Sequence, residues 1–240
     1  MQSFIFPWVG FFLFSCFPLS SRLSLFKASL IPYTQNSVQT PKPYEERLFM
    51  PSEEEKKPVV QDPQINEKLL KTRSIMLSGE INKESAEQVI KQLLVLEGEG
   101  NEAVRIFINS PGGDVDAGYA IFDMARFVSC PVYMIGMGLV ASAAALVLLA
   151  VPAEQRLALP NSTYLIHQPM SGMKGVATDI EIHALHLEKL RKKLDALIAQ
   201  ETGKSIAEVN SDTERDHWLS SDEALSYGLV SRIVKSRSEL

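Results

Sequence analysis

The sequence predicts an α/β fold whose sheet is made of short parallel strands joined by helices. Short apolar runs alternate along the chain with longer segments in which apolar residues recur every three to four positions. Breakers separate these runs, as at Gly98-Glu99-Gly100 and at Ser110-Pro111-Gly112-Gly113. Because strands that are separated by helices tend to pair in parallel, the alternation indicates a sheet covered by helices.

The first predicted elements lie between residues 67 and 135. A strand over 75–77 stops at Gly79, and Asn82 is suited to cap the helix that follows. The apolar residues of this helix form one stripe with a helical period, namely Ala86, Val89, Ile90, Leu93 and Leu94. The next elements are a strand over 104–108, a helix over about 117–127 and a strand over 132–135.

The second group of predicted elements begins with small apolar residues that indicate a buried helix. A long amphipathic helix follows two short strands, and a later short helix ends at Gly228, a residue type that often terminates helices. In order, the group comprises a helix over 141–150, strands over 157–159 and 164–166, helices over about 177–200 and 220–227, and a strand over 229–234.

Residues 1–49 differ in composition from the rest of the chain. They hold eight of the eleven Phe but only four basic and two acidic side chains, so the net charge of −5 becomes −7 for residues 50–240. Their apolar run precedes Arg22 and Lys27, whereas a secretory signal places positive charge before the run. Three interpretations stay open: translation that begins at Met50, a cleaved leader, or a membrane anchor.

Charge and proline content indicate where the folded domain begins, and composition excludes several classes of protein. Residues 50–66 are charged and interrupted by Pro, which predicts a flexible segment, and the folded domain is predicted over 67–240. The composition, with 45% hydrophobic and 22% charged residues, is that of a globular protein. Two cysteines, Cys16 and Cys130, exclude a disulfide scaffold and a four-thiolate zinc site. The negative net charge argues against a nucleic-acid binder.

Two small-residue segments are candidates for a reactive site. The turn from Asn109 to Gly113 ends an apolar strand, and its adjacent glycines allow backbone N–H groups to approach a ligand and hold an oxyanion. The alternative is a plain strand-to-helix turn. Ser142 stands alone among small apolar residues at the predicted start of a helix, where it is either an N-cap or a nucleophile.

Histidines supply the other candidates. His167 ends an apolar strand just before Pro169, so it is either a general base that faces a cleft or a hydrogen-bonded structural residue. His183 and His186 lie three residues apart on the long helix near Glu188, which suggests a metal site, but the sequence offers no third ligand and favours a solvated face. His217 is expected at the surface.

Taken together, these segments resemble the ClpP family, the proteolytic subunits of Clp proteases. The resemblance covers about residues 67–235, and the separations of 25 residues between Ser142 and His167 and 49 between His167 and Asp216 match the family without a gap. It rests on the motifs Asn109-Ser-Pro-Gly-Gly113, Ser142 in its small-residue stretch, Leu159-Pro-Asn161, Ile166-His-Gln-Pro169, Ala177-Thr-Asp-Ile-Glu-Ile-His183 and Asp212-Thr-Glu-Arg-Asp216.

The resemblance implies a serine peptidase with the ClpP/crotonase-like fold of repeated ββα units and a protruding handle helix. It matches Ser142 to the nucleophile, His167 to the general base and Asp216 to the acid that orients the imidazole. The residues alone do not select Asp216, since Asp212 and Asp222 compete with it. Gly113 and Ala143 match the two positions whose backbone N–H groups form the oxyanion hole; the family usually has Met at the second. No metal and no organic cofactor is implied.

The resemblance also implies partners. The family forms two stacked heptameric rings that enclose the active sites, joined through the long helix and residues 171–175, and receives unfolded protein substrates from a hexameric AAA+ Clp unfoldase. The chain has no Gly-x-x-x-x-Gly-Lys-Ser/Thr loop, so ATP chemistry belongs to that partner. Neither nucleic acid nor, in the mature form, a membrane is expected. The implied location is the bacterial cytoplasm, or a plastid or mitochondrial matrix if residues 1–49 are a transit peptide.

Two segments depart from the family pattern. Residues 50–66 do not match its apolar pore-lining start, which leaves open a ring mixed with a second ClpP paralogue, and residues 150–156 replace a Gly/Lys-rich loop. Two rival functions are a non-catalytic subunit that only completes a ring and a crotonase-type acyl-CoA enzyme. The set of Ser142, His167 and Asp216 argues against both.

Overall fold

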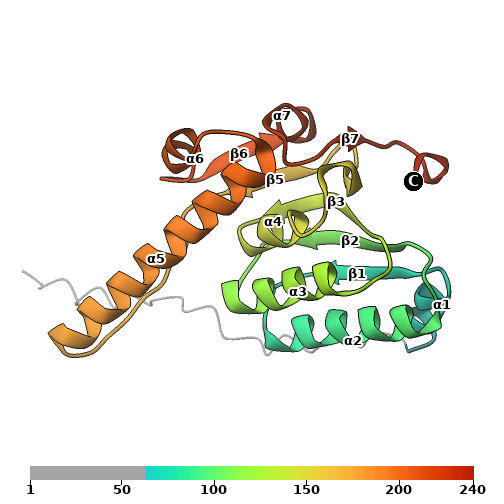
Figure 1. The fold of residues 1–240 in the computed structure, drawn as a ribbon, viewed down its shortest axis with the longest axis horizontal. Helices are drawn as coiled ribbons and strands as arrows, with labels where there is room; N and C mark the ends of the chain where they lie inside the picture. Colours follow the sequence, from blue (N-terminus) through green and yellow to red (C-terminus); the bar gives the residue numbers. More distant parts are fainter. Residues whose placement is uncertain (1–62) are drawn as a thin grey trace, which may run out of the picture. The chain divides into compact units, whose positions relative to one another are not determined.

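The computed structural model describes residues 63–240 (Figure 1). The predictions for residues 1–49, and those for most of the charged segment 50–66, lie outside the described residues. The first described element is helix α1 (Pro63–Lys71), which begins inside the segment that the sequence analysis treated as flexible. The proposed boundary at residue 67 therefore falls within a helix.

The sheet is mainly parallel, as predicted. Strands β1, β2, β3, β4 and β7 lie in that order and pair in parallel, and β5 pairs in parallel with the end of β3. The exception is β6, which the sequence analysis missed and which pairs antiparallel with β5. The strands are β1 (Ser74–Ser78), β2 (Val104–Ser110), β3 (Val132–Ala141), β4 (Arg156–Ala158), β5 (Thr163–Ile166), β6 (His217–Ser220) and β7 (Arg232–Ile233).

The helices begin and end near the predicted positions. Asn82 caps α2 through a bond from Ser85 N to its Oδ1 (2.9 Å), and Gly228 ends α7 in the left-handed conformation. Helix α6 was not predicted. The helices after α1 are α2 (Lys83–Glu99), α3 (Val115–Phe127), α4 (Ala143–Leu148), α5 (Ala177–Thr202), α6 (Ile206–Asp212) and α7 (Ser221–Tyr227), with short 3₁₀ turns at Ala153–Gln155 and Arg237–Glu239.

Strand β3 runs six residues beyond its predicted end at residue 135, because two glycines let it change partners. Its first half pairs with β4 up to Gly136, and its last three residues pair with β5. The ring of Tyr164 occupies the space that a side chain at Gly136 would need, and Gly138 adopts a φ of +57° beside Asn109. The change of partner carries the chain to Ser142, directly before the buried helix α4.

Helix α5 has two dissimilar halves. Its N-terminal half projects away from the sheet in Figure 1 and has no buried side chain, whereas Asp195, Ile198 and Ala199 are buried farther along. At its C-terminal end, Glu201 pairs with the buried Arg156 of β4 and, at 2.8 Å, with Arg126 of α3. The helix is thus anchored at one end only. Within residues 63–240, no helix is both long and apolar enough to cross a membrane.

Candidate active site

Ser142 lies at a strained junction between β3 and α4. Its φ of +56° and ψ of −122° are unusual for a residue with a side chain, and its backbone N–H donates to Leu165 O (2.9 Å). The side chain makes no capping hydrogen bond, although it precedes the first residue of a helix. The N-cap alternative therefore fails, and the strained backbone instead turns the hydroxyl toward β5.

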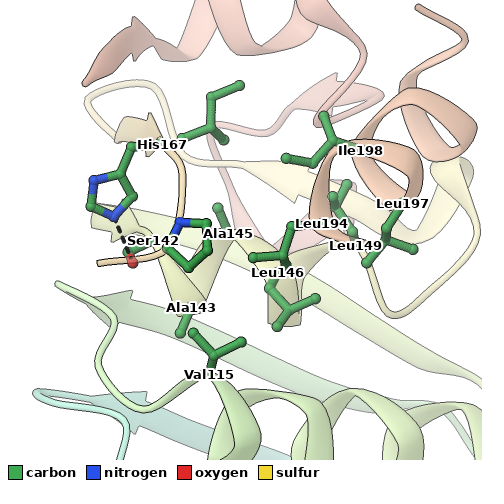
Figure 2. A pocket seen from close by; sticks show the side chains of 12 residues that line it. Val115, Ser142, Ala143, Ala145, Leu146, Leu149, His167, Leu194, Leu197 and Ile198 are labelled. Carbon is green, nitrogen blue, oxygen red and sulfur yellow. Dashed lines mark hydrogen bonds between the residues drawn. The ribbon is translucent and has the colours of Figure 1, made fainter. Parts of the chain in front are cut away.

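The hydroxyl of Ser142 is the first member of a hydrogen-bonded chain. Its Oγ lies 2.8 Å from His167 Nε2, as Figure 2 shows, and His167 Nδ1 lies 3.1 Å from Asp216 Oδ1. Both bonds are satisfied when the neutral imidazole carries its proton on Nδ1, which then donates to the carboxylate while Nε2 accepts from the hydroxyl. The side chain of His167 is 10% exposed and that of Asp216 58%. The structure thus brings the three predicted side chains together.

The position of Asp216 follows from the antiparallel pairing of β5 and β6. Ile166 and His217 are register partners, so the residues next to them in sequence, His167 and Asp216, meet at the same end of the two strands. The two competing acids lie elsewhere: Asp212 accepts from Tyr227 OH (2.9 Å), and Asp222 lies in the first turn of α7. The residue pattern alone does not select Asp216, because it does not predict β6, whose pairing with β5 brings Asp216 to His167.

The glycine turn after β2 lies against Ser142. A Cβ at Gly112 would come within 2.5 Å of Ala141 O, 2.7 Å of the Ser142 Cβ and 2.9 Å of Ala143 N. Gly113 has a φ of +145°, and Ile81 holds the turn by donating to Gly112 O and accepting from Asp114 N, each at 2.8 Å. Among the hydrogen bonds of residues 63–240, none uses the N–H of Gly113 or of Ala143. Both predicted oxyanion donors are therefore free to bind a ligand.

An apolar pocket opens beside Ser142 and His167 (Figure 2). The C-terminal half of α5 forms one wall and α4 another. This pocket was not predicted from the sequence, although Leu194, Leu197 and Ile198 have the spacing of a helix face that turns toward a core or a cavity. Besides Ser142 and His167, the lining residues are Val115, Ala143, Ala145, Leu146, Leu149, Ile166, Pro169, Leu194, Leu197 and Ile198.

Comparison with known proteins identifies the family. The family model described as Clp protease matches residues 56–237. The chain belongs to the Clp protease family. It is 59% identical over 175 residues to ATP-dependent Clp protease proteolytic subunit 2 of Treponema pallidum, covering 72% of this chain and 88% of that protein. It is 54% identical over 190 residues to the subunit of the same name from Treponema denticola, covering 79% and 95%.

A solved structure of a Clp protease agrees with the fold. A point mutant of ClpP1 from Listeria monocytogenes superimposes with a TM-score of 0.68 at 44% identity, covering 72% of this chain and 98% of that one. The predicted ClpP-like α/β fold is therefore confirmed, and so is the prediction of a Clp-type serine peptidase, because the relatives carry the name of the proteolytic subunit.

Among the hydrogen bonds of the described residues, none joins the remaining histidines of this Clp protease to the triad side chains. His183 Nε2 is 2.9 Å from Ser171 Oγ, and the neighbouring Glu188 pairs with Lys192 at 3.2 Å. His217 is half-buried, not fully at the surface, and its ring packs against Tyr227. In the described part of the chain, no group of three or more His, Cys, Asp or Glu side chains could hold a metal ion.

Proposed function

We propose that this Clp protease chain is a serine endopeptidase subunit that hydrolyses unfolded polypeptides through an acyl-enzyme. His167 Nε2 removes the proton of Ser142 as Oγ attacks the peptide carbonyl carbon, and the imidazolium then returns that proton to the leaving amine. Water, deprotonated by the same imidazole, hydrolyses the ester. Asp216 keeps the Nδ1 proton in place and stabilises the imidazolium, which is the role that its 3.1 Å contact supports.

The N–H groups of Gly113 and Ala143 are the proposed oxyanion donors. In the described part of the chain they are unpaired; one belongs to the glycine turn that packs against Ser142, and the other to the first residue of α4. A helix N-terminus also favours negative charge at this point. Since the donors are backbone groups, the Ala143 side chain does not weaken them. Loss of one such donor costs about 3–4 kcal/mol of transition-state stabilisation in other hydrolases.

The apolar pocket is the proposed binding site for the side chain that precedes the scissile bond. It adjoins both Ser142 and His167, and its walls of Leu, Ile, Val and Ala offer no partner for a charged group. An apolar side chain such as Leu would bury its surface there while its carbonyl faces the two N–H donors. We therefore expect cleavage after apolar residues.

The proposed assembly is two stacked heptameric rings that receive substrate from a hexameric AAA+ Clp unfoldase. Support comes from the family and from the unanchored half of α5, whose large apolar side chains would otherwise face water. Its exposed residues, with those of the loop before it, are Met170, Met173, Val176, Ile180, Ile182 and Leu185. We place the protein in the bacterial cytoplasm, as the bacterial relatives suggest. Native mass measurement of the purified chain tests the assembly and shows whether a second paralogue is needed.

The observation that carries the proposed activity is the continuous chain of hydrogen bonds from Ser142 through His167 to Asp216. The positive φ of Ser142 accompanies this arrangement. The test is cleavage of a fluorogenic peptide together with labelling by a fluorophosphonate. Ser142→Ala should abolish both without changing the native mass. Ser226→Ala, which removes an exposed hydroxyl on α7, is the matched control and should behave as wild type. A wild-type chain that neither cleaves nor labels, alone or with an unfoldase, would overturn the proposal.

A further inference from the structure

A buried carboxylate outside the triad lies on α5. Asp195 is 2% exposed, and its two oxygens accept hydrogen bonds from Thr213 Oγ1 and Asn210 Nδ2, each at 2.8 Å. Arg191, one turn earlier on the helix, brings its Nε to 4.0 Å from the same carboxylate. A buried carboxylate is retained only where it is well bonded, and here both donors come from α6 and the residue that ends it.

The hydrogen bonds of Asp195 connect it to residues that adjoin the triad. Thr213 is itself buried, and its carbonyl accepts from Gln168 N (2.7 Å), while the next carbonyl, that of Glu214, accepts from Gln168 Nε2 (2.7 Å). Gln168 follows His167 in sequence, and Glu214 lies two residues before Asp216. One short network therefore fixes the backbone on both sides of the contact between His167 and Asp216.

Asp216 depends on this network because little else holds it. Its side chain is 58% exposed, and among the hydrogen bonds and ion pairs of the described residues its carboxylate contacts only His167. The carboxylate of Glu214 pairs with Arg191, which adds a second tie from the segment to α5. An exposed side chain with a single partner keeps its place only if its backbone is held.

We propose that Asp195, assisted by Arg191, is a positioning residue that holds the segment 213–216 so that Asp216 meets His167. The inference rests on the proposed peptidase function, since it concerns the same triad. Asp195 touches neither substrate nor the reacting atoms and acts through Thr213. It also makes the triad sensitive to any movement of the C-terminal half of α5, whose other half is unanchored.

Replacement of Asp195 tests the proposal. Asp195→Ala removes both acceptors, and the freed segment should lower kcat for a short fluorogenic peptide by about 10- to 100-fold, as displacements of about 1 Å do. KM should stay within about two-fold, since the pocket walls remain. Asp195→Asn should restore most of kcat, because its Oδ1 still accepts from Thr213 and the amide of Asn210 can rotate to accept from its Nδ2.

Two further variants separate positioning from general damage. Thr213→Val removes only the hydroxyl bonded to Asp195, so it should lower kcat even if Asp195→Ala fails to assemble. Glu87→Ala is the matched control: it removes an exposed carboxylate on α2 that is paired with Lys91 four residues later, and it should leave kcat within about two-fold.

The decisive measurement repeats Asp195→Ala in an Asp216→Ala background, with the rate of fluorophosphonate labelling as readout. A residue that acts only through Asp216 has nothing left to position, so the second substitution should change the residual rate by less than about two-fold. Equal slowing in both backgrounds, or wild-type rates for both Asp195→Ala and Thr213→Val, would overturn the inference. A wild-type chain without any labelling would instead overturn the peptidase proposal itself.

Discussion

The two sides of the candidate site are held by different forces. The side with Ser142 is fixed by steric fit: α4 is fully buried, and Gly112 packs so closely on Ser142 and Ala143 that no side chain fits between them. The side with His167 and Asp216 is fixed by hydrogen bonds among β5, α5 and α6. Changes in volume should therefore damage the first side, and changes in hydrogen-bonding capacity the second.

The largest effect is expected from Asp216→Asn on the hydrogen-bonded side. The substitution keeps the volume but offers an N–H donor where Nδ1–H needs an acceptor, so the imidazole is held in the wrong tautomer; kcat should fall by about 10⁴-fold. The measurement is steady-state cleavage of a fluorogenic peptide. Asp222→Asn is the control, because that acid lies in the first turn of α7 and should matter little. If Asp222→Asn proves the more harmful change, the assignment of the third triad residue is wrong.

Gly112→Ala should have the next largest effect, on the steric side. Its Cβ would meet Ala141 O at 2.5 Å and cover the N–H of Ala143 at 2.9 Å, and φ there is +88°. We expect kcat to fall by about 10²- to 10³-fold, as when one oxyanion donor is lost, together with a lower melting temperature.

The matched control for Gly112→Ala is Gly98→Ala in α2. A Cβ at Gly98 meets no atom within 4 Å, so activity should not change, and helix propensity should raise stability by about 0.5–1 kcal/mol. Thermal unfolding and peptide cleavage report both results. Equal activity of the two glycine variants would show that steric fit does not fix the Ser142 side.

The same contrast explains what the sequence could and could not predict. On the steric side, apolar periodicity and glycines mark the strands and helices in the sequence. The predicted bounds of β1, β2, α2 and α3 therefore agree with the structure to within two residues. On the hydrogen-bonded side, α6 and β6 were missed, because their short polar segments have no clear period. Asp216 was therefore selected only through the family motif. The hydrogen-bond network of Asp195 was not predicted, because no residue pattern in the sequence indicates it.

Leu194→Ala should have a moderate effect that is confined to selectivity. Leu194 lines the proposed side-chain pocket from α5, so its truncation enlarges the pocket without touching the triad. The ratio of kcat/KM for peptides with Phe rather than Leu before the scissile bond should rise by about 10-fold, the usual size of discrimination by a few methylene groups. The two peptides are measured side by side. An unchanged ratio would show that the side chain binds elsewhere.

Tyr227→Phe should have the smallest effect on activity. It tests how far the hydrogen bonds that hold Asp216 extend beyond Thr213. Its hydroxyl donates to Asp212 at the end of α6 (2.9 Å), close to Thr213 in sequence, but among the hydrogen bonds of residues 63–240 none continues from the Asp212 side chain to the triad. Burial, with the neighbouring Asp212, raises the pKa of Tyr227, so the hydroxyl stays a donor throughout the neutral and mildly alkaline range. Loss of this bond should lower the free energy of unfolding by about 1 kcal/mol.

The activity of Tyr227→Phe distinguishes a hydrogen bond that only stabilises the fold from one that also positions Asp216. Because Asp195, not Asp212, holds the segment that carries Asp216, kcat should stay within about two-fold of wild type while Thr213→Val lowers it. Chemical denaturation and peptide cleavage on the same samples separate stability from catalysis. If Tyr227→Phe slowed cleavage as much as Thr213→Val, the placement of Asp216 would depend on α6 as a whole and not on the bond from Thr213 to Asp195.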